Sequence, residues 1–155
     1  MAPAPTPLVR DLPTALERAQ RAFERGHLRE AIELLEHALT LDPDHVSART
    51  MLGVAYARTH RVDEAFAHLE TALARAPGTF APRCALAELY LRLGIPEKAR
   101  PHLAGALEAA TTETERSYVH GLQQDDRTRE RHRVPRPNFS VPFWSRQPDR
   151  GSDEE

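Results

Sequence analysis

The chain has 155 residues, 40% of them hydrophobic and 28% charged, and a formal net charge of -2. This composition is typical of one soluble domain, and the small negative charge argues against nucleic acid or an anionic membrane as a partner. The single cysteine, Cys84, excludes an internal disulfide framework and fits a reducing compartment, so we expect a cytoplasmic protein. No run of about 18 apolar residues is present, so no membrane span is expected.

Proline dominates the start of the chain. Pro3, Pro5 and Pro7 predict a flexible leader over residues 1–11. Because this leader lacks both a basic segment and an apolar segment, we do not expect it to be a signal peptide.

Apolar residues then recur every three or four positions in paired segments, which is the spacing of amphipathic helices. The best-defined pair, in residues 46–77, holds Leu52, Gly53 and Tyr56 in its first segment and Ala65, Leu69 and Ala72 in its second. The small residues Gly53 and Ala65 fall where two helices would have to approach closely. The pattern therefore predicts a helical hairpin.

The hairpin is repeated along the chain with a period of about 34 residues. Sliding the chain against itself by this period aligns Pro43 with Pro77, Tyr56 with Tyr90, Leu69 with Leu103 and Ala72 with Ala106. Such a period with two helices per unit resembles the tetratricopeptide repeat (TPR) family. The resemblance covers about residues 12–111 and implies an all-α, TPR-type solenoid of three helical hairpins.

The repeat pattern also predicts the boundaries within the chain. We expect a TPR-like domain over residues 12–124, with repeats at about 12–45, 46–79 and 80–112 and a capping helix at 113–124. The capping helix should pack Tyr118, Val119 and Leu122 on the third repeat. From residue 125 the periodicity fails, so the charged, proline-rich residues 125–155 are predicted to be a disordered tail.

Three residues predict details of the hairpins. Gly26 suits the turn inside the first hairpin, and Asp63 is expected to cap the second helix of the second hairpin. Pro101 lies inside the second helix of the third hairpin, where we expect a kink or a lost hydrogen bond.

The resemblance implies that the first helix of each repeat lines a concave groove. The family's groove-facing positions hold Leu16, Gln20, Phe23, Thr50, Val54, Arg58, Cys84, Glu88, Leu91 and Arg92. This set is largely apolar with two arginines, which suits an extended or helical peptide with an occasional acidic group. The alternative is that these are ordinary surface residues of a spacer. The clamp that some members use for the carboxylates of chaperone tails has no matching basic residues here.

Aromatic residues gather in the predicted tail, where little else could bury them. Such side chains are costly to expose and often dominate binding energy. We therefore predict a docking motif formed by Phe139, Val141, Phe143 and Trp144. Its target would be the chain's own groove, a second copy or another protein, and a loose flap on the repeats is the alternative.

Motifs for other chemistry are missing from the sequence. The eight histidines do not converge at the spacing of a metal site, and His68 and His102 simply occupy equivalent repeat positions. Acidic neighbours dilute the arginines of residues 127–136, which argues against binding to phosphates. No nucleotide-binding loop, nucleophile motif or zinc-protease motif is found, so we expect no enzyme activity, cofactor, metal or small-molecule substrate.

The sequence therefore predicts a non-enzymatic adaptor or scaffold that binds a peptide or protein through the groove, the aromatic tail motif, or both. One alternative is a small TPR chaperone for a secreted or assembly client, because bacterial secretion chaperones of similar size carry three such repeats. Another is a structural, self-assembling subunit, so homo-oligomerisation is left open.

Overall fold

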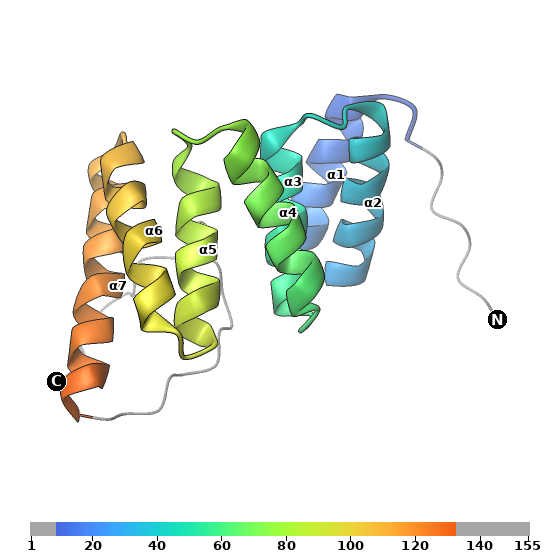
Figure 1. Cartoon of the computed structure of the whole chain (residues 1–155). Helices are drawn as coiled ribbons and strands as arrows, with labels where there is room; N and C mark the ends of the chain where they lie inside the picture. Colours follow the sequence, from blue (N-terminus) through green and yellow to red (C-terminus); the bar gives the residue numbers. More distant parts are fainter. Residues whose placement is uncertain (1–8, 133–155) are drawn as a thin grey trace, which may run out of the picture. The chain divides into compact units, whose positions relative to one another are not determined.

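The computed structural model describes residues 9–132, which form seven α-helices and no strand (Figure 1). In chain order they are α1 (Leu12–Glu24), α2 (Leu28–Leu41), α3 (Val46–Arg58), α4 (Val62–Arg75), α5 (Phe80–Arg92), α6 (Pro96–Ala109) and α7 (Glu113–His132). None of these described helices is long and apolar enough to cross a membrane. The chain divides into two compact units, Met1–Pro82 and Arg83–Glu155, so α5 begins in the first unit and continues in the second.

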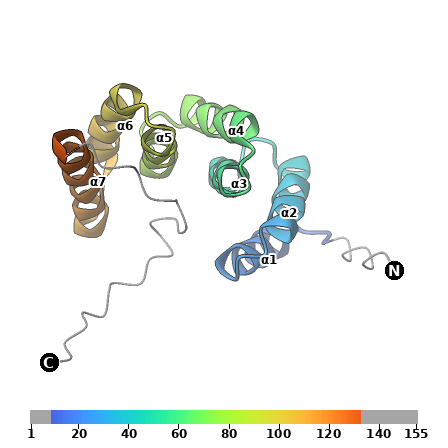
Figure 2. The ribbon, with the colours of Figure 1, turned by 90° about the horizontal axis from the view of Figure 1, so that it is seen from below.

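The first unit contains two helical hairpins, α1 with α2 and α3 with α4, and α2 also packs on α3 (Figure 2). Its largest fully buried side chains are Phe23, Leu35, Leu52 and Leu69. Small residues are buried with them. Seven alanines are 0% exposed: Ala15, Ala19, Ala31, Ala38, Ala55, Ala65 and Ala72. The apolar stripes predicted from the repeat period are thus the faces that the helices bury against one another.

Helices α3 and α4 approach each other closely at Gly53. A Cβ atom added there would lie 2.7 Å from Cγ of Leu69 and 3.2 Å from the carbonyl oxygen of Ala65. Both distances are shorter than ordinary van der Waals contacts, so the two backbones approach closely only because Gly53 has no side chain. The close approach predicted for Gly53 and Ala65 is confirmed.

The same backbone turn closes each of the three hairpins. Gly26, His60 and Gly94 occupy equivalent positions of successive hairpins and have positive φ values of 78°, 63° and 75°. The residue after each one donates its N–H back to the last turn of the helix: His27 to Ala22 at 2.8 Å, Arg61 to Tyr56 at 2.9 Å and Ile95 to Tyr90 at 2.9 Å. This is the glycine-type helix end expected at Gly26, and His60 adopts it without glycine's freedom.

Replacing His60 with glycine is expected to raise the free energy of unfolding by about 1 kcal/mol, because a left-handed conformation costs an L-residue more than glycine. Urea unfolding followed by circular dichroism measures the change. The matched control is Gly94→Ala, where a Cβ would meet nothing within 4 Å, so only the cost of the positive φ changes. Gly94→Ala should lower the free energy of unfolding by a similar amount. A loss of stability on His60→Gly would contradict the backbone argument.

The second unit packs α5, from Arg83 onward, against α6 and α7. Cys84, Leu86, Leu103 and Val119 are at most 1% exposed in it. The Tyr118 hydroxyl of α7 donates a hydrogen bond to Glu88 of α5. This bond attaches the capping helix to the third hairpin, as predicted for Tyr118. Of the other two residues expected to pack there, Val119 is buried and Leu122 is half-buried.

The capping helix α7 begins with a reciprocal cap. The backbone N–H of Glu115 donates to the Thr112 hydroxyl at 3.2 Å, and the Glu115 carboxylate accepts from the N–H groups of Thr111 at 2.7 Å and Thr112 at 3.2 Å. This arrangement satisfies donors that a helix start otherwise leaves unpaired. The sequence pattern Thr-x-x-Glu at Thr112 and Glu115 is typical of this cap.

The end of α7 differs from the prediction, because residues 125–132 were assigned to a disordered tail and are helical. Asp126 is only 4% exposed and pairs with Arg100 of α6 at 3.3 Å, and Glu130 pairs with the same arginine at 3.0 Å. Arg129 and Arg131 in the last turn also complement the negative end of the helix dipole. The helix therefore continues through a charged sequence that has no apolar stripe.

The N-cap of α4 is Arg61 and not Asp63. Asp63 lies in the first turn, where its carboxylate still interacts favourably with the positive end of the helix dipole.

Pro101 lies inside α6, which continues from Pro96 to Ala109. Because proline has no N–H, this helix lacks one backbone hydrogen bond, as expected.

Candidate protein-binding surface

In the first unit, the predicted groove residues lie on α1 and α3 at different depths. Phe23, Thr50 and Val54 are buried, with 1%, 4% and 8% of their surface exposed. Leu16 is half-buried, and Gln20 is exposed and donates to Glu24 at 3.0 Å. A partner meeting this face would therefore reach Leu16, Gln20 and Arg58 above a packed layer.

Arg58 ends α3 with its guanidinium carbon 5.0 Å from the centre of the Phe23 ring of α1. This is the distance of a cation–π contact. The side chain is half-buried, and burial lowers the pKa of Arg58 from its ordinary value. Arginine nevertheless keeps its charge at neutral pH, so this face presents a partly desolvated cation.

In the second unit, the predicted groove residues are mostly enclosed. Cys84, Glu88 and Leu91 are 0%, 6% and 7% exposed, and Arg92 is half-buried. Burial, followed by the charge of Glu88, raises the pKa of the Cys84 thiol well above its usual range. The thiol is therefore protonated at neutral pH and packs as a small core residue, unlike a reactive cysteine, which is exposed and has a lowered pKa.

A feature that the sequence reading missed is a tyrosine–histidine stack in two successive hairpins. Tyr56 stacks on His68 with ring centres 5.4 Å apart, and Tyr90 stacks on His102 at 5.6 Å. The signal was available, because the two tyrosines and the two histidines each occupy equivalent positions of the repeat. The stacks give the histidines a packing role, and no group of three or more potential metal ligands occurs in residues 9–132.

Charged groups surround the first of these stacks. The Tyr56 hydroxyl donates to Glu36 of α2, and the Arg61 guanidinium carbon lies 4.5 Å from the centre of the Tyr56 ring. Burial, and then the hydrogen bond to Glu36, raises the pKa of Tyr56 to about 12. The hydroxyl therefore remains a donor at neutral pH and links α3 to α2.

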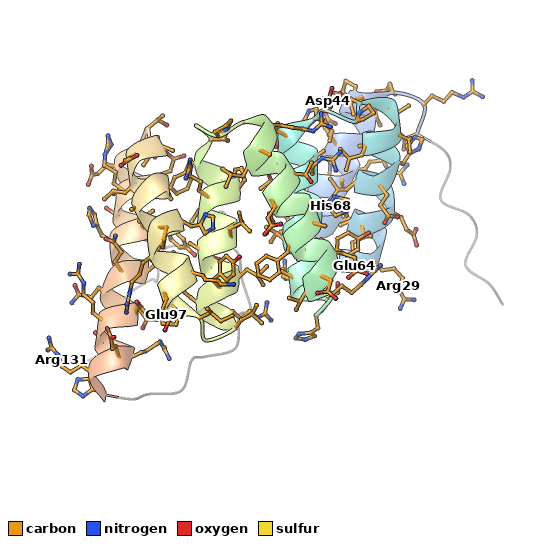
Figure 3. The ribbon with its side chains drawn as sticks, viewed as in Figure 1. Arg29, Asp44, Glu64, His68, Glu97 and Arg131 are labelled. Carbon is orange, nitrogen blue, oxygen red and sulfur yellow. The ribbon has the colours of Figure 1, made fainter. Side chains whose placement is uncertain are left out.

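His68, labelled on α4 in Figure 3, should make stability depend on pH. Burial, and then the charge of Arg49 on α3, lowers its pKa below the ordinary 6.5, outweighing the opposite influence of Glu36 on α2 and Glu64 on α4. Below pH 6.5 the unfolded chain takes up a proton that the folded chain does not. The free energy of unfolding should therefore fall as pH drops through 6.5 toward the lower folded pKa.

Two measurements check this expectation. An NMR titration of the His68 imidazole should have its midpoint below 6.5, and His68→Gln should flatten the dependence of the unfolding midpoint on pH between neutral and mildly acidic solution. A titration midpoint at or above the ordinary value would contradict it.

The aromatic motif predicted in the tail lies outside the described residues, which end at His132. Phe139, Val141, Phe143 and Trp144 therefore stay a prediction. At the other end, the ring of His37 donates to the carbonyl oxygen of Val9 at 2.5 Å, which holds the last leader residues against α2.

The repeated helical hairpins define a helical-repeat protein, a class that presents helix faces to partners. Two family models, each described as tetratricopeptide repeat, match residues 16–80 and 60–125. The chain belongs to the TPR family. Its fold is an all-α solenoid of helical hairpins, as predicted. TPR proteins are in general scaffolds for protein interaction and are generally non-enzymatic.

Solved structures agree with this assignment. A structure titled MamA MSR-1 C2 is 27% identical with a TM-score of 0.57, over 64% of this chain and 57% of that one. A TPR protein of Thermus thermophilus, TTC0263, is 30% identical with a TM-score of 0.57, over 72% and 57%. The TPR domain of P58(IPK) is 20% identical with a TM-score of 0.68, over 79% and 34%, and supports the fold alone. The chain thus spans less than two thirds of the length of each of these three, and no curated protein sequence matches it.

Proposed function

We propose that the chain is a non-enzymatic adaptor that binds a peptide segment of a protein partner on the face formed by α1 and α3. The observation that carries this proposal is the contact of Arg58 on α3 with the Phe23 ring on α1. Phe23, Thr50 and Val54 are buried, whereas Leu16, Gln20 and Arg58 on the same two helices remain accessible to a partner.

Such a face combines apolar, hydrogen-bonding and cationic groups on two rigid helices. Apolar contacts would provide affinity, while the polar groups would fix the register of the bound peptide. Helices hold these groups in place before the partner arrives, which reduces the entropy lost on binding. The aromatic motif at Phe139, Phe143 and Trp144 would add a second contact, made by the chain's own tail.

The test begins with selection of peptides from a display library of random linear peptides, using the full-length chain as bait. A photo-crosslinking amino acid then replaces Gln20 on α1, or, as a matched control, the exposed Glu33 on α2. We expect the selected peptides to crosslink at position 20 and not at position 33. The proposal fails if no peptide is selected, or if both positions crosslink equally.

A further inference from the structure

Arg58 differs from most other arginines whose side chains make contacts in the structure. Five arginines form ion pairs with carboxylates of the chain: Arg21 with Glu17, Arg61 with Glu64, Arg75 with Asp44, Arg100 with Asp126, and Arg129 with Asp125. Arg58 forms its contact with the Phe23 ring instead. Within residues 9–132, no carboxylate pairs with Arg58.

Arg58 is half-buried, so the lack of a carboxylate partner leaves its charge partly desolvated and uncompensated. Burial lowers the pKa of Arg58, and no neighbouring carboxylate acts to raise it. The cation has therefore lost part of its hydration without gaining a counter-charge. An aromatic ring attracts a guanidinium through its π-face, which leaves several of the five N–H donors for an acceptor. A carboxylate would satisfy these donors and neutralise the charge.

The immediate surroundings favour such a pairing. Val54 lies one helical turn before Arg58 on α3 and is 8% exposed, and Phe23 is 1% exposed. The Phe23 ring excludes water from one side of the guanidinium, which strengthens a charge-assisted hydrogen bond compared with one at a fully exposed arginine. The Phe23 ring also restricts where the guanidinium lies, so less side-chain freedom would be lost on binding.

The geometry points to Arg58, held over Phe23, as the anchoring position for an aspartate or glutamate side chain of the bound partner peptide. This inference rests on the proposed function and specifies the chemistry of the peptide. The partner would present an acidic residue to α3, next to residues that contact Leu16 and Gln20 on α1.

The experiment measures binding of selected peptides to the full-length chain by fluorescence anisotropy. Each peptide is made in two forms, one with its acidic residue and one with the corresponding amide. The protein variants are Arg58→Gln, Arg58→Lys and Arg29→Gln. Arg29 is the matched control because it is exposed and projects from the first turn of α2 away from the helices (Figure 3). Thermal unfolding verifies that each variant is folded.

We expect the selected peptides to be enriched in Asp or Glu at one position. Arg58→Gln should weaken binding of the acidic peptide about tenfold or more and leave binding of the amide peptide unchanged. Arg58→Lys should weaken binding of the acidic peptide less, because lysine keeps the charge but lacks the planar donors. Arg29→Gln should have no effect. The amide peptide tests the pairing on the wild-type protein, so the result does not depend on how Arg58→Gln folds.

Other outcomes overturn the inference in distinguishable ways. Peptides that crosslink at position 20 without an acidic preference, or that bind Arg58→Gln unchanged, overturn the anchoring role and leave the proposed function standing. Selection of no peptide, or crosslinking without preference for position 20, overturns both.

Discussion

Replacing Leu69 with alanine is expected to lower the free energy of unfolding by about 2–5 kcal/mol. Leu69 is 1% exposed, and it fills the contact between α4 and α3 beside Gly53. Removing its side chain loses the burial of several methyl and methylene groups and leaves a cavity that the closely packed backbones cannot collapse to fill. Urea unfolding followed by circular dichroism measures the loss.

A double-mutant cycle with Gly53→Ala shows whether the packing argument is right. In the wild-type background the new Cβ would clash with Leu69, so Gly53→Ala should destabilise the chain although alanine favours helices. With Leu69→Ala present, the clash with the Leu69 side chain is gone and only the contact with the Ala65 carbonyl oxygen remains. Gly53→Ala should then be much less destabilising, because the helix propensity of alanine, about 1 kcal/mol over glycine, offsets more of the cost. An equal loss of stability in both backgrounds would contradict the close contact between Gly53 and Leu69.

The hairpins and their cores were predictable because one physical pattern sets them. Residues that recur at the repeat spacing, such as Leu69 and Leu103, are both 1% exposed. The end of α7 was not predictable in this way. Asp126 is stabilised by Arg100, which lies on another helix and far away in the sequence. A local pattern cannot show an ion pair of this range, so a charged segment was taken as disordered although tertiary contacts hold it in a helix.

The positions of the candidate binding face were predictable from the sequence, but how far each side chain is exposed was not. Family positions placed Val54, Arg58 and Cys84 together, yet their exposure depends on how tightly neighbouring helices pack. Val54 and Cys84 are buried, and Arg58 remains half-exposed against Phe23. A pair such as Arg58 and Phe23, distant in sequence and on different helices, becomes visible only once α1 and α3 are assembled.

Replacing Pro101 with alanine should produce the largest gain in stability, raising the free energy of unfolding by about 2 kcal/mol, since proline inside a helix costs about 3 kcal/mol relative to alanine. Part of the gain is offset because alanine gives the unfolded chain more freedom. Pro101 is exposed, so no packing is lost. The new N–H can also donate to the carbonyl oxygen of Glu97, one turn earlier in α6.

The reciprocal change supplies the control, because the second hairpin has Ala67 at the position of Pro101, exposed within α4. Ala67→Pro should lower stability by about 3 kcal/mol or more, since it removes an existing helical hydrogen bond. Urea unfolding of the two variants compares the same exchange in adjacent repeats. If Pro101→Ala leaves stability unchanged while Ala67→Pro lowers it, α6 has adapted to its proline in a way that α4 has not. The missing hydrogen bond would then be a local cost that the second unit already compensates.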